Sequence, residues 1–196
     1  MDETLRYEHF GANDQKAAAN ETLLEYQTNL QNLALQAQDA GATPILLTPL
    51  SRRDFTTPTN LTLNLIDQRT YTIYAAANTS TSYLDLNQAS VEYLLAIGNA
   101  TAQTYDLACT DETHLNDWGS VVFGRMVADL VLGHAPVVHV HDGSDGQSEH
   151  VQKSENNKAK VPAWGDLKSW FVPNATLSAD IWHGVWAQGG DCPLES

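Results

Sequence analysis

A short apolar run between two prolines, Pro44–Pro49, restricts the fold more than any other stretch of the sequence. A continuous apolar run of this length is typical of a strand buried on both faces, as strands of parallel sheets are. Apolar residues before it recur at intervals of three and four, which predicts a helix ended by Gly41. The predicted buried face of that helix consists of Leu23, Tyr26, Leu30, Leu33 and Ala37.

Similar strand and helix patterns alternate along the first 133 residues. In order, the sequence predicts the end of a strand at 5–10, a polar loop with Arg52 and Arg53 at 51–60, a helix through Leu63, Ile66, Thr70, Ile73 and Ala77, a strand at 83–86, a helix at 89–97, and a helix from an N-cap at Asn116 to about Leu132. The alternation predicts the α/β class, as a three-layer α/β/α fold with a parallel sheet. Functional sites in such folds lie beyond the carboxyl ends of the strands.

An acid and an imidazole lie three residues apart just before the last of these helices. Asp111 and His114 belong to the stretch Cys109–Gly119, and this spacing lets their side chains meet on one tight turn. Asp111 can then accept the Nδ1 proton of His114 and leave Nε2 as a general base for a hydroxyl nucleophile. The alternatives are a surface histidine that caps a turn and a solvated loop carboxylate. With 24 acidic residues and 7 histidines, such a pair also arises by chance.

The stretch Phe10-Gly11-Ala12-Asn13-Asp14 follows the first predicted strand. The side-chain amide of Asn13 is a suitable donor to a developing oxyanion. The alternative is an asparagine favoured in a turn for its own backbone hydrogen bonds. Asp14 is predicted to brace that turn, and Gly11 permits a loop conformation denied to other residues.

Two of these motifs, Gly-x-Asn-Asp at 11–14 and Asp-x-x-His at 111–114, resemble the third and fifth sequence blocks of the SGNH (GDSL) hydrolase family. The stretch Thr48–Phe55 is similar to the rhamnogalacturonan acetylesterase-like branch of that family. The resemblance covers residues 5–133, about two-thirds of the chain, and its parts occur in the family's order.

The resemblance implies an SGNH or flavodoxin-like fold and the hydrolysis of a carboxylic ester, with an O-acetyl group on plant cell-wall polysaccharide or a small ester as substrate. His114 would be the general base, Asp111 its orienting acid and Asn13 an oxyanion-hole donor, supported by Gly11 and Asp14. The implied reaction needs no cofactor and no metal.

The family's first block, a Gly-Asp-Ser that carries the nucleophile, has no counterpart before Gly11, which only ten residues precede. The second block, whose glycine amide helps to form the oxyanion hole, has none either. The interpretation is therefore a hydrolase domain that lacks its N-terminal strand, with the nucleophile unknown. The alternative is a non-catalytic, truncated or decayed hydrolase that at most binds glycan.

Composition excludes several classes of partner. With 10 Lys and Arg residues and a net charge of −14, the chain is a poor ligand for nucleic acid. No run of 18 apolar residues exists, so no membrane span is expected. Met1 is followed by three polar residues, Asp2, Glu3 and Thr4, and the start of the sequence shows no signal-peptide pattern. Five Asn-x-Ser/Thr sequons nevertheless favour a secreted glycoprotein, and we expect a monomer. They begin at Asn20, Asn60, Asn78, Asn99 and Asn174.

The character of the chain changes after residue 133, so the predicted domains are 1–133 and a C-terminal extension, 134–196. Ser144 follows a possible strand at 137–141, but it comes after the Asp-x-x-His motif and is a poor candidate nucleophile. A metal site is the weaker interpretation of nearby residues, which are His139, His141, Asp142 and His150.

Two further patterns involve the end of the chain. Trp182 and Trp186 are four residues apart and could share a helical face, either as core residues or as a platform for sugar rings. Cys109 and Cys192 are the two cysteines, and either a disulfide or two separate thiols is compatible with the sequence.

Overall fold

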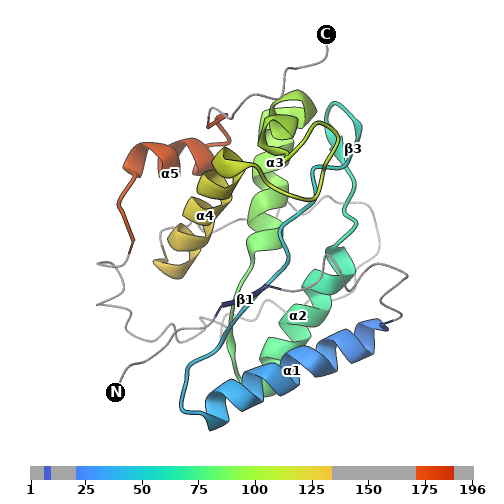
Figure 1. Ribbon diagram of the computed structural model, residues 1–196, viewed down its shortest axis with the longest axis vertical. Coiled ribbons are helices and arrows are strands. Elements are labelled where there is room, and N and C mark those ends of the chain that lie inside the picture. The colour runs from blue at the N-terminus through green and yellow to red at the C-terminus, as the bar shows by residue number, and fades with distance from the viewer. Residues whose placement is uncertain (1–6, 10–20, 134–170, 188–196) are drawn as a thin grey trace, which may run out of the picture.

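The computed structural model describes residues 7–9, 21–133 and 171–187, and Figure 1 shows their arrangement. The helices and strands are β1 (Tyr7–His9), α1 (Leu23–Asp39), β2 (Ile45–Leu47), β3 (Phe55–Thr57), β4 (Asn60–Leu61), α2 (Ile66–Thr79), β5 (Ser82–Leu84), α3 (Leu86–Ala102), the 3₁₀ turn η2 (Gln103–Tyr105), α4 (Asp117–Val131) and α5 (Ala175–Trp182). The strands β1, β2 and β5 alternate with helices, as the sequence predicts.

Three of the strands form a parallel sheet in the order β1-β2-β5. His9 is paired with Leu47, and Leu47 with Leu84, so all three strands end at the same edge. The prediction of a parallel sheet is confirmed, and so is the buried strand after Pro44, because each residue of β2 is buried.

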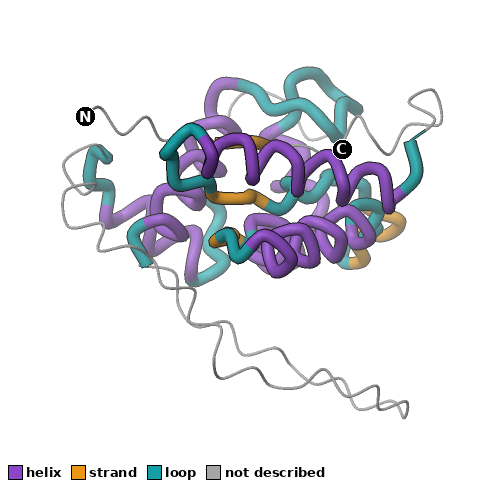
Figure 2. Tube along the Cα trace, turned by 90° about the horizontal axis from the view of Figure 1, so that it is seen from below, coloured by secondary structure: helices purple, strands orange, loops and turns teal. Residues whose placement is uncertain are grey.

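Helices cover both faces of this sheet. Leu46 packs in a cluster with Tyr26 and Leu30 of α1 and with alanines of α2, whereas Leu47 packs with residues of α3, α4 and α5. Successive side chains of a strand point to opposite faces, so these two leucines reach different helical layers. Figure 1 shows α1 and α2 on one side of the strands and α3, α4 and α5 on the other, and Figure 2 shows α1 and α2 next to each other. The three-layer prediction is confirmed.

α1 begins with a capping box, in which Thr22 and Glu25 exchange hydrogen bonds between side chain and backbone. Gly41 follows its C-terminus with a φ of +80°, the left-handed conformation expected at a helix stop. The buried face is Tyr26, Leu30 and Ala34. The prediction of Leu33 on this face is wrong, because the stripe turns toward Ala34 and leaves Leu33 38% exposed.

α2 buries a face different from the predicted one. Its buried residues are Gln68, Thr72, Ala75, Ala76 and Thr79, whereas Leu63, Ile66 and Ala77 are exposed. The small alanines pack against α1, and the Thr72 hydroxyl is paired with the Tyr26 hydroxyl at 2.8 Å. A polar group that forms a hydrogen bond can be buried at little cost in free energy. A prediction that buries only the hydrophobic residues therefore selects the wrong face of α2.

The prediction of a simple polar loop at 51–60 is also wrong. The antiparallel strands β3 and β4 lie there, with Phe55 paired with the buried Leu61. Two further boundaries differ: Leu86 begins α3 rather than ending a strand, and α3 continues beyond Ile97 across a kink at Gly98.

Residues 171–187 belong to the same core. Leu177, Ile181 and Ala187 join the cluster formed by α3 and α4. Trp182 is half-buried and its Nε1 donates to Asp129 at 2.9 Å. α5 ends at Trp182, so the prediction that Trp182 and Trp186 share a helical face is wrong. The division into two domains at residue 133 stays a prediction.

Candidate active site

The candidate site lies on residues 106–116, which connect η2 to α4 and which we call the dyad loop. Its two ends are held together by an antiparallel bridge between Asp106 and Leu115. The Leu107 amide donates to the His114 carbonyl at 3.0 Å, and the Asn116 amide donates to the Tyr105 carbonyl at 3.0 Å. These backbone bonds close the base of the loop and leave its outer part, residues 108–114, to present side chains.

Asp111 and His114 contact each other on this outer part. The Nδ1 atom of His114 lies 2.9 Å from Oδ2 and 3.1 Å from Oδ1 of Asp111. The backbone amides of Thr113 and His114 also donate to Asp111 Oδ1, at 3.2 and 3.0 Å. The contact that the sequence spacing predicts is confirmed. The catalytic roles of both residues stay predictions.

The surroundings of Asp111 keep it ionised. The hydrogen bond from the His114 amide, followed by the one from the His114 ring, lowers the pKa of the Asp111 carboxyl below its usual value. A carboxylate only accepts, so the proton of a neutral His114 ring belongs on Nδ1, and Nε2 is left unprotonated. The His114 side chain is 64% exposed, so its ring is accessible to a reacting group.

The N-terminus of α4 fixes where the loop ends. Asn116 is its N-cap as predicted, with its Oδ1 accepting from the Gly119 amide at 2.8 Å and its Nδ2 donating to the Thr104 carbonyl at 2.8 Å. A Cβ at Gly119 would lie 2.8 Å from the Tyr105 carbonyl oxygen. Glycine therefore lets α4 start directly against the backbone of η2, three residues after His114.

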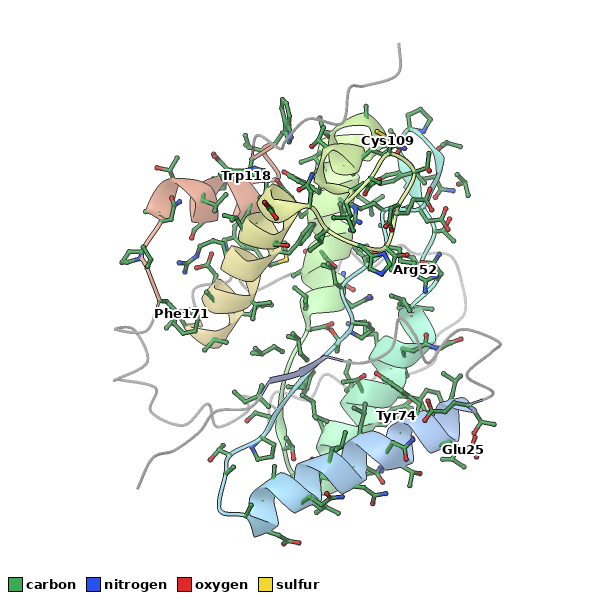
Figure 3. The ribbon with its side chains drawn as sticks, viewed as in Figure 1. Glu25, Arg52, Tyr74, Cys109, Trp118 and Phe171 are labelled. Atoms are coloured by element: carbon green, nitrogen blue, oxygen red, sulfur yellow. The ribbon has the colours of Figure 1, made fainter. Side chains whose placement is uncertain are left out.

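Arg53 lies beneath the dyad loop and is fully buried. Its Nε donates to Asp106, and its Nη2 donates to the carbonyls of His114, at 2.7 Å, and Asp111, at 3.3 Å. Figure 3 labels the neighbouring Arg52 beside this loop. The sequence predicts a polar loop around Arg53 and does not indicate that its side chain is buried. The signal that could have identified it is its place in Thr48–Phe55, one of the stretches that carry the family resemblance.

The dyad loop is attached to the carboxyl edge of the sheet. Arg53 follows β2, which ends at Leu47, and β1 ends at His9 in register with Leu47. The predicted oxyanion residues Gly11, Asn13 and Asp14 follow β1, but they lie outside the residues that the structure describes. Ser144, the four residues of the possible metal site and Cys192 lie outside them as well.

Among the described residues, no hydroxyl group is hydrogen-bonded to Nε2 of His114, so the nucleophile stays unassigned. The same part of the chain contains no group of three or more His, Cys, Asp and Glu residues placed to hold a metal ion. Within residues 7–9, 21–133 and 171–187, no helix combines the length and apolar character needed to cross a bilayer.

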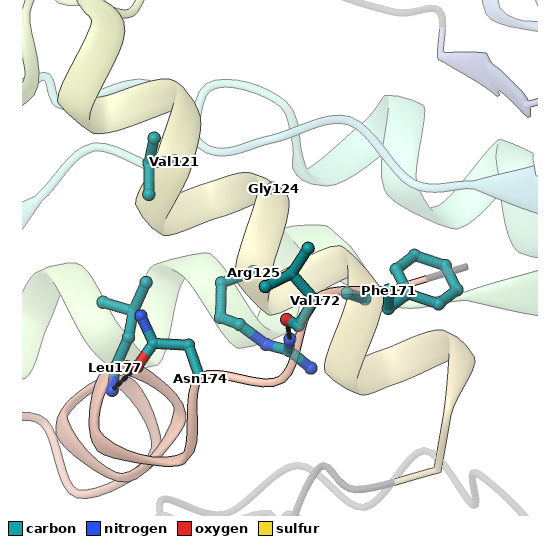
Figure 4. Close-up of a pocket in the computed structure, with 8 residues that line it drawn as sticks. Val121, Gly124, Arg125, Phe171, Val172, Asn174 and Leu177 are labelled. Atoms are coloured by element: carbon teal, nitrogen blue, oxygen red, sulfur yellow. Dashed lines mark hydrogen bonds between the residues drawn. The ribbon is translucent and has the colours of Figure 1, made fainter. Parts of the chain in front are cut away.

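A hollow of about 310 Å³ lies elsewhere, between α4 and residues 171–177 (Figure 4). Arg125 lines it, but its guanidinium is engaged by Asp129 and by the Val172 carbonyl. Neither Asp111 nor His114 contributes to the lining. The Asp111–His114 pair and the hollow are therefore separate features.

Comparisons with known proteins give a structural relative. No protein-family model matches the chain. No curated protein matches it either. Among solved structures, the crystal structure of the protein YxiM from Bacillus subtilis is similar, with a TM-score of 0.59 at 23% sequence identity. The match covers 67% of this chain and 37% of YxiM, so the chain spans little more than a third of its structural relative. The likeness shows a shared α/β fold.

Proposed function

We propose that this chain carries the acid–base half of an SGNH-type hydrolase that cleaves carboxylic esters. The observation that carries the proposal is the contact of His114 with an ionised Asp111, on a loop attached to the carboxyl edge of a parallel sheet. This is where sites of α/β folds occur. The fold shared with YxiM and the motif order of the sequence add support.

The mechanism assigns one step to each group. A serine hydroxyl attacks the acyl carbon while Nε2 of His114 takes its proton, and Asp111 stabilises the resulting imidazolium. Asn13 donates to the oxyanion of the tetrahedral intermediate. When the ester bond breaks, His114 returns the proton to the leaving alcohol. Water then attacks the acyl-serine with His114 again as base, which releases the carboxylic acid and regenerates the serine.

The described residues do not supply the serine of this mechanism. Within the described residues, β1 is paired only with β2, so no described strand occupies its other edge. The SGNH resemblance implies that the strand bearing the nucleophile lies in the middle of the sheet. We infer that this strand pairs with the edge of β1 opposite β2 and brings its serine to the carboxyl edge.

For the substrate we propose an O-acetyl group on a plant cell-wall polysaccharide, hydrolysed outside the cell. The support is the similarity of Thr48–Phe55 to the rhamnogalacturonan acetylesterase-like branch. The sequon residues Asn60, Asn78 and Asn174 are exposed, as glycosylated asparagines must be. Release of acetate from acetylated and chemically deacetylated pectin, compared side by side, would test this substrate class.

The hydrolase proposal is tested on the natural gene product, whose N-terminus is first read by mass spectrometry after deglycosylation. We expect hydrolysis of 4-nitrophenyl acetate, covalent labelling of one serine by an organophosphate, and loss of both in the His114→Ala variant. The matched control is His183→Ala, which changes an exposed histidine at the end of α5. A product with neither hydrolysis nor labelling contradicts the proposal and favours a non-catalytic glycan-binding protein.

A further inference from the structure

We propose that Arg53 is the positioning residue of the dyad, because one guanidinium holds the backbone of both of its members. This inference rests on the proposed function, which makes His114 and Asp111 the reacting pair. It concerns a residue that lies under the loop and cannot touch the substrate directly.

The geometry is specific to the two dyad residues. Nη2 of Arg53 donates to the His114 carbonyl at 2.7 Å and to the Asp111 carbonyl at 3.3 Å. The Arg53 amide donates to the Glu112 carbonyl at 2.9 Å. A single residue thus binds three of the four carbonyls between positions 111 and 114. Bonds at both ends of this turn set the separation of the two side chains that must meet.

Asp106 fixes the guanidinium itself. Both side chains of the Arg53–Asp106 pair have 0% exposure, and Asp106 also forms the bridge at the base of the loop. The planar guanidinium donates from Nε and Nη2 in fixed directions, so the Nε bond to Asp106 determines where Nη2 points. Asp106 therefore orients Arg53 toward the loop.

The presence of the buried Arg53–Asp106 pair is poorly explained by a contribution to folding stability. Burial raises the pKa of the Asp106 carboxyl, and the hydrogen bond from Arg53 only opposes that rise. Since the folded-state pKa of this acid is raised, ionised Asp106 opposes folding at neutral pH. Apolar residues of similar volume often replace a buried ion pair without loss of stability. Such apolar residues could not bind the backbone carbonyls of residues 111–114 and so could not hold this turn in place.

Two kinds of variant distinguish an effect on the position of the turn at residues 111–114 from an effect on folding. The double variant Arg53→Met/Asp106→Leu removes both charges together, so that neither is left buried alone. The single variant Arg53→Lys keeps a cation for Asp106, but a lysine lacks the planar fork that reaches Asp106 and the loop carbonyls at once. If the double variant does not fold, Arg53→Lys carries the test.

The readout is the His114 ring in long-range ¹H–¹⁵N spectra of the chain, assigned with His114→Asn. In the wild type we expect the proton on Nδ1, facing Asp111. In either Arg53 variant we expect the Nε2-protonated tautomer to become the major form, with thermal unfolding still cooperative. In a form of the protein that hydrolyses esters, kcat should fall about 100-fold with little change in KM, as for a displacement of about 1 Å.

Arg125→Met is the matched control, because Arg125 is also a largely buried arginine paired with an aspartate and bonded to a backbone carbonyl. It lies eight residues after Asp117, about 12 Å along α4. Its tautomer should match that of the wild type. An unchanged tautomer in the Arg53 variants, or an equal change in Arg125→Met, overturns the positioning role. Because the tautomer is read without substrate, this result is independent of whether the chain hydrolyses esters.

Discussion

Asp111 is oriented by the backbone of its own turn as well as by its contact with His114. Its carboxylate accepts from two backbone amides of its own turn, so the chain itself orients the carboxylate before the imidazole is considered. Because an exposed ion pair contributes little to stability, we expect Asp111→Ala to change the free energy of unfolding by less than about 1 kcal/mol.

The lowered pKa of Asp111 has a consequence at acid pH. Its folded-state pKa lies below the unfolded value of about 3.9, so the carboxylate stabilises the folded loop fully above that value. That contribution is lost only as the pH falls through the lowered pKa. The ¹³C shift of the Asp111 carboxyl, followed from pH 6 downward, should therefore turn below the midpoint of an unfolded reference peptide. A midpoint at or above that of the peptide would contradict this.

Arg53 and Asp106 predict a distinctive pattern of stabilities. Arg53→Met should lower the free energy of unfolding by about 3–5 kcal/mol, because it leaves a buried carboxylate without its partner. Arg53→Met/Asp106→Leu should recover most of this loss. Urea unfolding of the two variants measures the difference. Equal destabilisation of both would show that the charge left behind is not the cause.

The sequence predicts the residue contacts that are local, and it fails where a contact depends on a distant partner. Asp111 and His114 are three residues apart, so their meeting follows from the turn. Arg53 and Asp106 are 53 residues apart, and only the packed fold shows that they pair in the interior. An arginine in a polar stretch is normally solvated, so the sequence predicts a polar loop at 51–60 and gives no sign of a buried Arg53.

At the scale of the element, α4 supports the dyad by starting close to η2. The side chain of its N-cap, Asn116, donates to the Thr104 carbonyl, and Gly119 lies against the Tyr105 carbonyl. The start of this helix and the position of the loop are therefore a single structural feature.

Two glycines of α4 should respond to alanine in opposite directions. Gly119→Ala should lower the free energy of unfolding by about 1–3 kcal/mol, because the added carbon meets the Tyr105 carbonyl at 2.8 Å. Gly124→Ala should raise it by about 0.5–1 kcal/mol, since its added carbon meets nothing within 4 Å and alanine favours helix. Thermal unfolding of the two variants compares them. A stabilising Gly119→Ala would show that α4 is not held against η2.

Helix positions are more predictable from the sequence than helix faces are. The N-cap at Asn116 and the stop at Gly41 were predicted because local chemistry determines both. The face of α2 was not, because its contact with α1 uses alanines and a hydroxyl that Tyr26 satisfies. Those partners come from another helix, and periodicity within α2 contains no information about them.

At the scale of the whole molecule, a buried tyrosine pair joins the C-terminal segment to the layer that carries the dyad loop. The Tyr105 hydroxyl lies 2.7 Å from that of Tyr93 and donates to the Ala187 carbonyl at 2.6 Å. The Ala187 amide donates to the Tyr93 hydroxyl at 3.1 Å. Residues 171–187 are thereby fixed to α3 and η2, adjacent to the base of the loop.

Tyr105→Phe should lower the free energy of unfolding by about 1–3 kcal/mol, because buried polar groups of Tyr93 and Ala187 lose a partner. Hydrogen exchange at Ala187 should accelerate in parallel. Tyr74→Phe is the matched control, since Tyr74 is 53% exposed, and it should change stability little. An unaltered Ala187 exchange rate in Tyr105→Phe would contradict the proposed attachment.

The α/β class was predictable because alternating strands and helices permit few arrangements. The attachment of residues 171–187 was not, because the segment rejoins the core through contacts with residues more than 40 positions earlier. A change in composition after residue 133 marks a different kind of sequence, but it does not indicate whether a later segment packs on the same core.

The most direct test of the central claim is the protonation pattern of the His114 ring at neutral pH. We predict that the neutral form of the ring carries its proton on Nδ1 and leaves Nε2 unprotonated, and that Asp111→Ala abolishes this preference. Long-range ¹H–¹⁵N spectra of both proteins give the answer directly. A wild-type ring protonated on Nε2, or a pattern unaffected by Asp111→Ala, would contradict the claim that this pair is a general base with its orienting acid.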